Sequence, residues 1–265
     1  MKIVKNILTK NPCYKAGKRI QVKGLMLHSV GCPQSKASAF INSWNRESYD
    51  SACVHAFIDG NDGTVYQTLP WEYFGWHCGG TGNSSYLGVE MCEPDCIQYV
   101  VGARFICYNE IEAKAVVRRT YQSAVELFAY LCNRYNLDPL KDGVILSHSE
   151  GYRRGIAANH GDPEHLWNGL GMDYTMDGFR QDVREAMESK KEVTMKEKEK
   201  YLVKVNIPDL NIRKGPGTDY QKTGKYTGIG TFTIVEESDG IGAEKWGRLK
   251  SGVGWIPLDY AKKLA

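Results

Sequence analysis

The sequence of 265 residues predicts an α/β domain, in which helices flank a mixed central sheet, followed by a small all-β module. Short apolar segments alternate with helical patterns in the first part of the chain, an order that is typical of layered α/β folds. A charged segment then fills residues 188–200. After it, glycines separate short strand-like segments every ~8–12 residues, as in small β-barrels. The expected divisions are a domain at residues 1–188, a linker at 189–200 and a module at 201–265.

The strands of the first domain follow from its apolar segments. Four short segments bounded by turn residues are expected to form buried strands. They lie at residues 22–28, 52–59, 87–91 and 144–148. The sequence GNDG at residues 60–63 indicates a hairpin turn that leads into a further strand at residues 64–68.

Two helices are expected in the same domain. Over Glu110–Tyr135, apolar residues recur at steps of four and three along one face. Asn136 and Pro139 should end this helix. A last helix is expected at residues 176–187, with Thr175 as its N-cap. The charged segment that follows, ESKKEVTMKEKEK, has no apolar face and is either a solvated linker or an extension of that helix.

Composition excludes several classes of protein. The net charge is only +3, which is too small to indicate a nucleic-acid partner. No run of about 18 apolar residues occurs, so we expect no insertion into a membrane. Residues 1–10 lack the apolar core of a signal peptide, which predicts synthesis in the cytoplasm and release by another factor if the target lies outside. The eight cysteines have no paired spacing, and we expect reduced thiols.

Two histidines stand at the ends of expected strands. His28 ends the first strand and His148 ends the fourth, and the carboxyl ends of strands face the crevice where α/β sheets usually place ligands. A loop that contains His160 and Asp162 follows. Two neutral imidazoles and one carboxylate, with one position left to water, are the ligands of a catalytic zinc site. A single histidine at a strand end is, however, more often a hydrogen-bonded structural residue.

From residue 23 to residue 187 the chain resembles the type-2 N-acetylmuramoyl-L-alanine amidases, a group that includes phage endolysins, bacterial autolysins and the peptidoglycan recognition proteins. Six ordered motifs carry the resemblance. They are the strand ending in His28, VHAFID with GTVYQ at residues 54–59 and 63–67, GWHCGG at 75–80, NSSYLGVE at 83–90, the strand ending in His148, and the Asp162–Pro163 pair.

The resemblance implies a function and a set of roles. The substrate would be bacterial peptidoglycan, cut at the amide bond between N-acetylmuramic acid and L-alanine. His28, His148 and Asp162 would hold Zn²⁺, and Glu90 would take a proton from the attacking water. The alternative is a protein of the same fold that binds peptidoglycan without cleaving it. The expected biological role is that of a phage or prophage endolysin, which acts on the cell wall after release from the cytoplasm.

The chain departs from the family pattern at two positions. Val54 stands where some relatives have a tyrosine, so Glu90 must carry more of the chemistry. His160 replaces a lysine that is thought to stabilise the oxyanion, and it could take over that role or be the third metal ligand itself. His165 is expected to support the same loop.

Three further residues are expected near the substrate from their family positions. His55, His77 and Trp76 would contact the substrate or support the site. Packing remains an alternative for His55, and the tryptophans at 71 and 76 could equally fill the core.

The tail, from about residue 201 to residue 264, resembles bacterial SH3 domains. LNIRKGPGTDY at residues 210–220 and GWI at 254–256 carry the resemblance. It implies a small barrel that binds the cell wall, although the same glycines would serve the turns of a barrel without a ligand.

Overall fold

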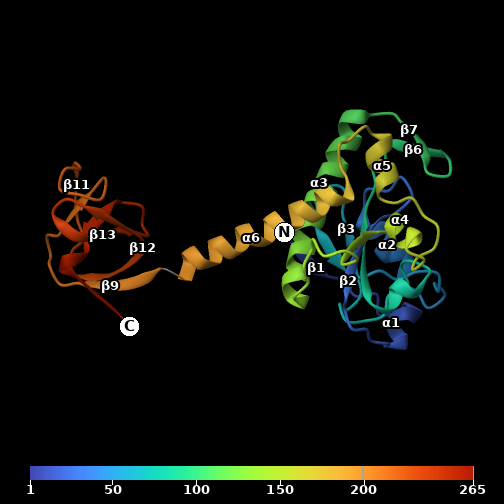
Figure 1. Ribbon diagram of the computed structural model, residues 1–265, viewed down its shortest axis with the longest axis horizontal. Helices are drawn as coiled ribbons and strands as arrows, with labels where there is room; N and C mark the ends of the chain where they lie inside the picture. The colour runs from blue at the N-terminus through green and yellow to red at the C-terminus, as the bar shows by residue number, and fades with distance from the viewer. Residues whose placement is uncertain (199, 265) are drawn as a thin grey trace. The chain divides into compact units, whose positions relative to one another are not determined.

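The computed structural model describes residues 1–198 and 200–264, which form two compact units. The first unit is Met1–Met187 and the second is Glu188–Ala265 (Figure 1). Within the described residues, no helix is both long and apolar enough to cross a membrane. All eight cysteines are free thiols, and five of them are buried.

The first unit is built on a six-stranded mixed sheet. Its order is β1-β4-β3-β5-β2-β8, and every neighbouring pair is parallel except the antiparallel pair β3 and β4. This confirms the predicted mixed α/β architecture. The strands are β1 (Ile3–Lys5), β2 (Gly24–Ser29), β3 (Ala56–Ile58), β4 (Val65–Gln67), β5 (Tyr86–Met91) and β8 (Ile145–Ser147).

Helices cover both faces of this sheet. The longest, α3, spans Glu110–Tyr135, the range that the apolar spacing predicts. The Asn109 side chain caps its first turn by accepting from Glu112 N, and Asn136 ends it in the left-handed conformation. The other helical segments are α1 (Pro12–Ala16), α2 (Ala37–Trp44), η1 (Thr81–Ser84), α4 (His148–Arg153), α5 (Glu164–Gly169) and α6 (Met176–Lys198).

The alternation of side chains along the strands separates the core from the functional face. In β2, Leu25 and Leu27 are fully buried in the core that α3 and α6 cover, and in β5 Leu87 and Val89 join them. Since successive side chains of a strand point to opposite faces, His28 must lie on the other face. Burial of each such leucine or valine stabilises the fold by about 1.5–3 kcal/mol, which keeps the register fixed.

A two-stranded hairpin lies outside the central sheet and was not predicted. It consists of β6 (Ile97–Val101) and β7 (Arg104–Cys107), joined through Gly102, which has a positive φ of 55°. Figure 1 shows it next to α5. Its outer positions are exposed; of its inner positions, Ile97 is buried and Tyr99, Phe105 and Cys107 are half-buried.

The helix α6 is longer than the spacing of apolar residues indicates. It begins where expected, and the Thr175 hydroxyl accepts from Gly178 N as an N-cap should. It then continues to Lys198 through most of the charged segment that the sequence analysis treats as a linker. Glu, Lys and Met are strong helix formers, so a helix can propagate through such a segment without an apolar face.

The second unit contains a seven-stranded sheet in which every pair of neighbours is antiparallel. Its apolar core includes Val203, Val205, Ile234, Leu249 and Ile256. This agrees with the all-β module expected from the glycine-punctuated sequence. The elements are β9 (Tyr201–Val205), β10 (Asn211–Arg213), β11 (Lys222–Tyr226), β12 (Gly230–Gly240), β13 (Ala243–Leu249), β14 (Trp255–Pro257), η2 (Leu258–Tyr260) and β15 (Ala261–Lys263).

Candidate metal centre and cavity

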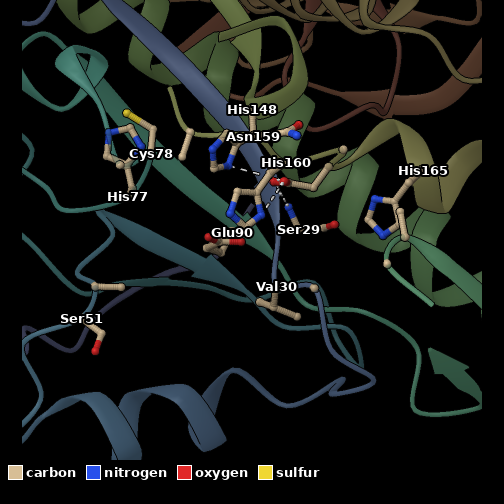
Figure 2. A pocket seen from close by; sticks show the side chains of 18 of the residues that line it. Ser29, Val30, Ser51, His77, Cys78, Glu90, His148, Asn159, His160 and His165 are labelled. Carbon is tan, nitrogen blue, oxygen red and sulfur yellow. Dashed lines mark hydrogen bonds and ion pairs between the residues drawn. The ribbon is translucent and has the colours of Figure 1, made fainter. Parts of the chain in front are cut away.

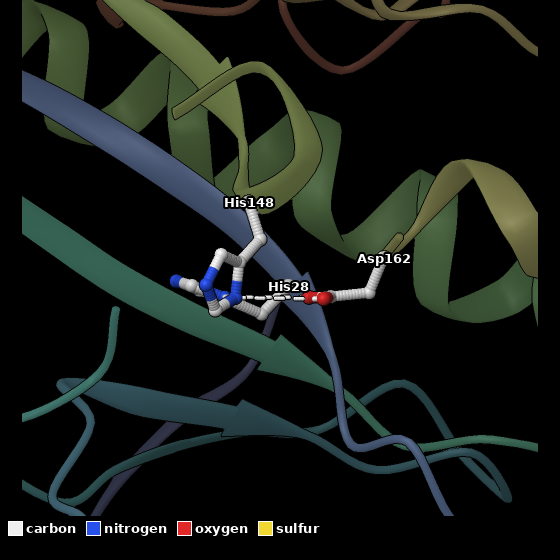
Figure 3. Close-up of side chains that lie close together, drawn as sticks. All are labelled: His28, His148 and Asp162. Atoms are coloured by element: carbon white, nitrogen blue, oxygen red, sulfur yellow. Dashed lines mark hydrogen bonds and ion pairs between the residues drawn. The ribbon is translucent and has the colours of Figure 1, made fainter. Parts of the chain in front are cut away.

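Three buried side chains from distant parts of the chain meet above the carboxyl end of the sheet. They are His28, His148 and Asp162, which together could hold a metal ion (Figure 3). The two Nδ1 atoms lie 3.0 Å apart. One carboxylate oxygen of Asp162 lies 3.4 Å from His28 Nδ1, and the other lies 3.4 Å from His148 Nδ1.

Local structure positions each of these ligands. His28 is in β2, next to β5 in the sheet. His148 is the first residue of α4, whose N-terminus is fixed by a capping box between Ser147 and Glu150. Asp162 lies in the loop before α5, and its Oδ2 accepts from the backbone N–H of Ser29 at 3.2 Å. The carboxylate is thereby tied to the end of the strand that carries His28.

The arrangement fits zinc. Bonds of about 2.0–2.1 Å in a tetrahedron separate two ligand atoms by about 3.3 Å, close to the three separations found here. Three protein ligands leave the fourth position to water or substrate, as in catalytic rather than structural sites. Burial lowers the pKa of His28, so its imidazole is neutral and free to bind a metal. Burial alone would raise the pKa of Asp162, but hydrogen bonds from His148 and His28 hold it below its usual range.

His77 supports His28 from the side away from the other ligands. Its Nδ1 lies 3.0 Å from His28 Nε2, and its Nε2 lies 3.0 Å from the carbonyl oxygen of Tyr86. If His28 binds a metal through Nδ1, its Nε2–H donates to His77, and His77 donates to Tyr86. Burial lowers the pKa of His77, which keeps it neutral and able to accept. Such partners orient a metal-bound histidine and raise its basicity.

Glu90 faces the metal group from the neighbouring strand. In the register of β2 and β5 it stands directly opposite His28. Its Oε2 atom is buried and has no hydrogen-bond partner among the described residues. Burial, together with the negative charges of Asp162 and Glu93, raises the pKa of Glu90 well above its ordinary value. An unpartnered carboxylate here is a ready proton acceptor.

These side chains open into a cavity of about 540 Å³. Figure 2 shows Glu90, His148 and His160 around its centre, with His77 on one side and His165 on the other. Trp76 and Ser51 line one wall, and the hairpin tip at Gly102 lines another. This volume is enough for a peptide- or sugar-sized ligand beside the metal group.

Comparison with known proteins places this geometry in a family. A model of the family described as N-acetylmuramoyl-L-alanine amidase matches residues 18–165, which is more than half of the chain and includes the metal group and Glu90. The chain belongs to this amidase family.

Two similar proteins come from Staphylococcus aureus. A bifunctional autolysin is 32% identical over 69 residues, a match that covers 26% of this amidase chain and only 5% of the autolysin. The crystal structure of the hydrolase AmiA in complex with its ligand is similar at a TM-score of 0.55 and 22% identity, over 72% of this chain and 86% of AmiA. The second likeness shows a shared fold.

The structure separates the remaining expected residues of the amidase domain into different roles. His160 lies at the cavity, with its side chain 62% exposed and its ring stacked on that of His148 at 4.6 Å between centroids. Its Nδ1 lies 4.0 Å from Asp162, and it is not in the group of three ligands. Trp76 lines the cavity as expected, whereas Trp71 is buried in the core.

His55, for which substrate contact or support of the site was expected, is not among the residues that line the cavity. Its side chain is fully buried, its Nδ1 accepts from Gly88 N at 3.0 Å, and its Nε2 donates to the Tyr73 carbonyl at 2.8 Å. Burial lowers its pKa to about 4, so it is neutral. Since both ring nitrogens bond to backbone, His55 joins strand β5 to the loop at Tyr73.

The space for His77 depends on Gly88, a residue that sequence reasoning did not single out. A Cβ atom at Gly88 would lie 2.3, 2.5 and 2.7 Å from atoms of the His77 ring and side chain. Only a glycine in the middle of a strand leaves this room. The available signal in the sequence was an isolated glycine inside an apolar strand pattern, because such a glycine often marks a place where another group packs closely against the strand backbone.

We expect Gly88→Ala to push His77 away from His28 and to destabilise the domain by about 1–3 kcal/mol, the usual cost of overpacking. Denaturant unfolding of metal-free protein measures this cost. The same change in a His77→Ala background should cost much less, because the conflicting ring is gone. An equal cost in both backgrounds would show that the crowding at Gly88 involves another neighbour.

Proposed function

We propose that the chain is a zinc-dependent amidase that hydrolyses the bond between N-acetylmuramic acid and L-alanine in bacterial peptidoglycan. The observation that supports this best is the pairing of three buried ligands at tetrahedral spacing with the unpartnered Glu90 carboxylate on the adjacent strand. Family membership supplies the substrate class. The place of action is then the cell wall, as for endolysins and autolysins.

The residues of the cavity suit a single-displacement hydrolysis. Bound zinc would polarise the amide carbonyl and acidify the attacking water. Glu90 takes the proton from that water and then delivers it to the leaving nitrogen, so no covalent intermediate with the protein is required. His160, exposed at the cavity with its Nδ1 4.0 Å from the Asp162 carboxylate, can donate to the developing oxyanion.

Digestion of purified peptidoglycan tests this function. We expect glycan strands whose muramic acid residues no longer carry stem peptides, together with released peptides that begin with L-alanine. Mass spectrometry and end-group analysis identify both products. Binding to the wall with no release of peptide would instead support the alternative of a non-catalytic peptidoglycan-binding protein. New reducing sugar ends would point to cleavage of the glycan and contradict the proposal.

We further propose that the second unit is an SH3-like module that holds the enzyme on the wall. Its antiparallel sheet and the LNIRKGPGTDY segment support this, as does a groove of about 300 Å³. Asp209, Arg213 and Tyr260 are among the residues that line the groove, and they offer charged groups of both signs and an aromatic ring to a peptide.

A fragment of residues 1–187 should retain the amidase activity and lose wall binding. The first unit is compact by itself, so we expect near-normal hydrolysis of soluble muropeptides. Sedimentation with whole walls should show binding weaker by about tenfold or more, because the second contact is lost. Equal sedimentation of fragment and full chain would mean that the second unit does not bind the wall.

A further inference from the structure

Tyr99 of the hairpin joins the buried Glu93 and the half-buried His165 beside the metal group. Its hydroxyl donates to Glu93 Oε2 at 2.6 Å and lies 2.6 Å from His165 Nε2. The Glu93 side chain is fully buried, and its Oε1 accepts from Gly31 N at 3.0 Å. These four residues form one continuous hydrogen-bonded network.

The network joins the three loops that carry the site. Each of its other three members lies three positions beyond a residue of the proposed site, on the same loop or strand end. These pairs are His28 and Gly31, Glu90 and Glu93, and Asp162 and His165. The Tyr99 hydroxyl connects Glu93 to His165, and Glu93 connects in turn to Gly31, so this one side chain joins the loop of Asp162 to the other two.

The hairpin that carries Tyr99 is held in place by packing against α5. The ring of Phe105 in β7 packs so closely on α5 that a Cβ atom at Gly169 would lie 2.6 Å from it. Phe105 also meets the Tyr99 ring edge-on, with centroids 5.9 Å apart. His165 lies in α5, on the far side of the cavity from His77 (Figure 2). The hairpin is therefore seated on the helix that begins just after Asp162.

Simple packing does not account for these polar groups. Burial raises the pKa of Glu93 to about 7, a sign that its carboxylate is held in an unfavourable environment. Burying a carboxylate costs stability unless its partners compensate, and apolar side chains of similar size would fill the same space at lower cost. A polar network in this place is more useful for fixing geometry than for stabilising the fold.

We propose that Tyr99 is a positioning residue for the metal group: by holding Glu93 and His165 together, it fixes Asp162 at the spacing that zinc requires. This inference rests on the proposed function only in taking zinc as the metal. Tyr99 touches none of the three ligands, so its effect is on their placement, and metal affinity is the quantity that it should change.

Tyr99→Phe tests the inference, with Tyr121→Phe as a matched control. Tyr121 is likewise a tyrosine whose hydroxyl donates to a carboxylate, Asp182, at 2.7 Å, but it is a residue of α3 in the core, away from the metal group. Zinc affinity of the full chain is measured by competition with a chromophoric chelator, and thermal unfolding is followed on metal-free protein. Both variants should unfold at lower temperature, whereas only Tyr99→Phe should bind zinc about 10–100-fold more weakly.

A second variant makes the result independent of Tyr99 itself. His165→Phe removes the other end of the same hydrogen bond and should weaken zinc binding to a similar extent. The double variant should be little worse than either single one, because both act through one network. Additive losses would contradict a shared network.

The possible failures are distinguishable. Unchanged zinc affinity in Tyr99→Phe, or an equal loss in Tyr121→Phe, would overturn this inference and leave the proposed function intact. Failure of the unaltered chain to bind zinc would overturn the proposed function together with it. The measurement uses zinc alone and no peptidoglycan, so an absence of wall hydrolysis does not affect its outcome.

Discussion

Replacement of Glu90 by glutamine should lower the rate of hydrolysis by about 10²–10⁴-fold while zinc binding and folding stay nearly normal. The glutamine keeps the shape of the side chain but cannot take a proton from water. Glu90 is not one of the three grouped ligands, and its buried oxygen has no other partner among the described residues. The loss should therefore appear in kcat with soluble muropeptides, with zinc content measured on the same samples.

The pH profile gives a second readout for the same residue. A proton acceptor works only when ionised, so the rate of the unaltered enzyme should fall as the pH falls through the pKa of Glu90. This acidic limb should be missing from the glutamine variant.

Glu164→Gln is a matched control for this experiment. Glu164 is a half-buried carboxylate with a pKa that burial raises and with one oxygen lacking a partner among the described residues, but it does not line the main cavity. Its replacement should change kcat by less than about threefold. Near-normal turnover in Glu90→Gln, or equal losses in both variants, would remove Glu90 from the mechanism.

Asp162→Ala should abolish both zinc binding and activity, whereas His160→Ala should keep its zinc. Asp162 contacts both ligand histidines and is buried, while the His160 side chain is largely exposed and 4.0 Å from the Asp162 carboxylate. Removing one of three protein ligands leaves too few to hold the metal. Chelation of the unaltered enzyme should likewise abolish activity, and added zinc should restore it.

His160→Ala should still cost about 10²–10³-fold in kcat, the usual penalty for one lost oxyanion donor. His160→Lys should recover part of this rate and extend activity to higher pH, because lysine stays protonated where imidazole does not. Metal analysis decides between the two roles. Zinc retained in Asp162→Ala and missing from both His160 variants would make His160 the third ligand.

The elements that position the site could be predicted because their signals are local. The apolar spacing of α3 and its asparagine caps are contained in one continuous segment, so its bounds agree with the structure at both ends. His28 and His148 could be placed at strand ends for the same reason. Their meeting with Asp162 followed from family resemblance rather than from the strands themselves.

Other features depend on contacts that no local pattern records. The roles of His55 and His77 differ in their contacts. Both nitrogens of the His55 ring bond to backbone, whereas the His77 ring lies against His28 in the space left by Gly88. The network at Tyr99 includes a hydrogen bond between residues 66 positions apart, and it begins on a hairpin that the sequence analysis did not identify.

The sequence by itself thus determined the bounds of α3, the start of α6 and most of the central strands, because propensity and apolar periodicity act over a few residues. Only the tertiary structure decided which imidazole nitrogen faces which partner. The reason is the sheet order, in which β5 lies between β3 and β2 and brings Glu90 beside His28 across 62 residues of chain. Hydrogen-bond geometry varies over tenths of an ångström, and long-range packing sets it.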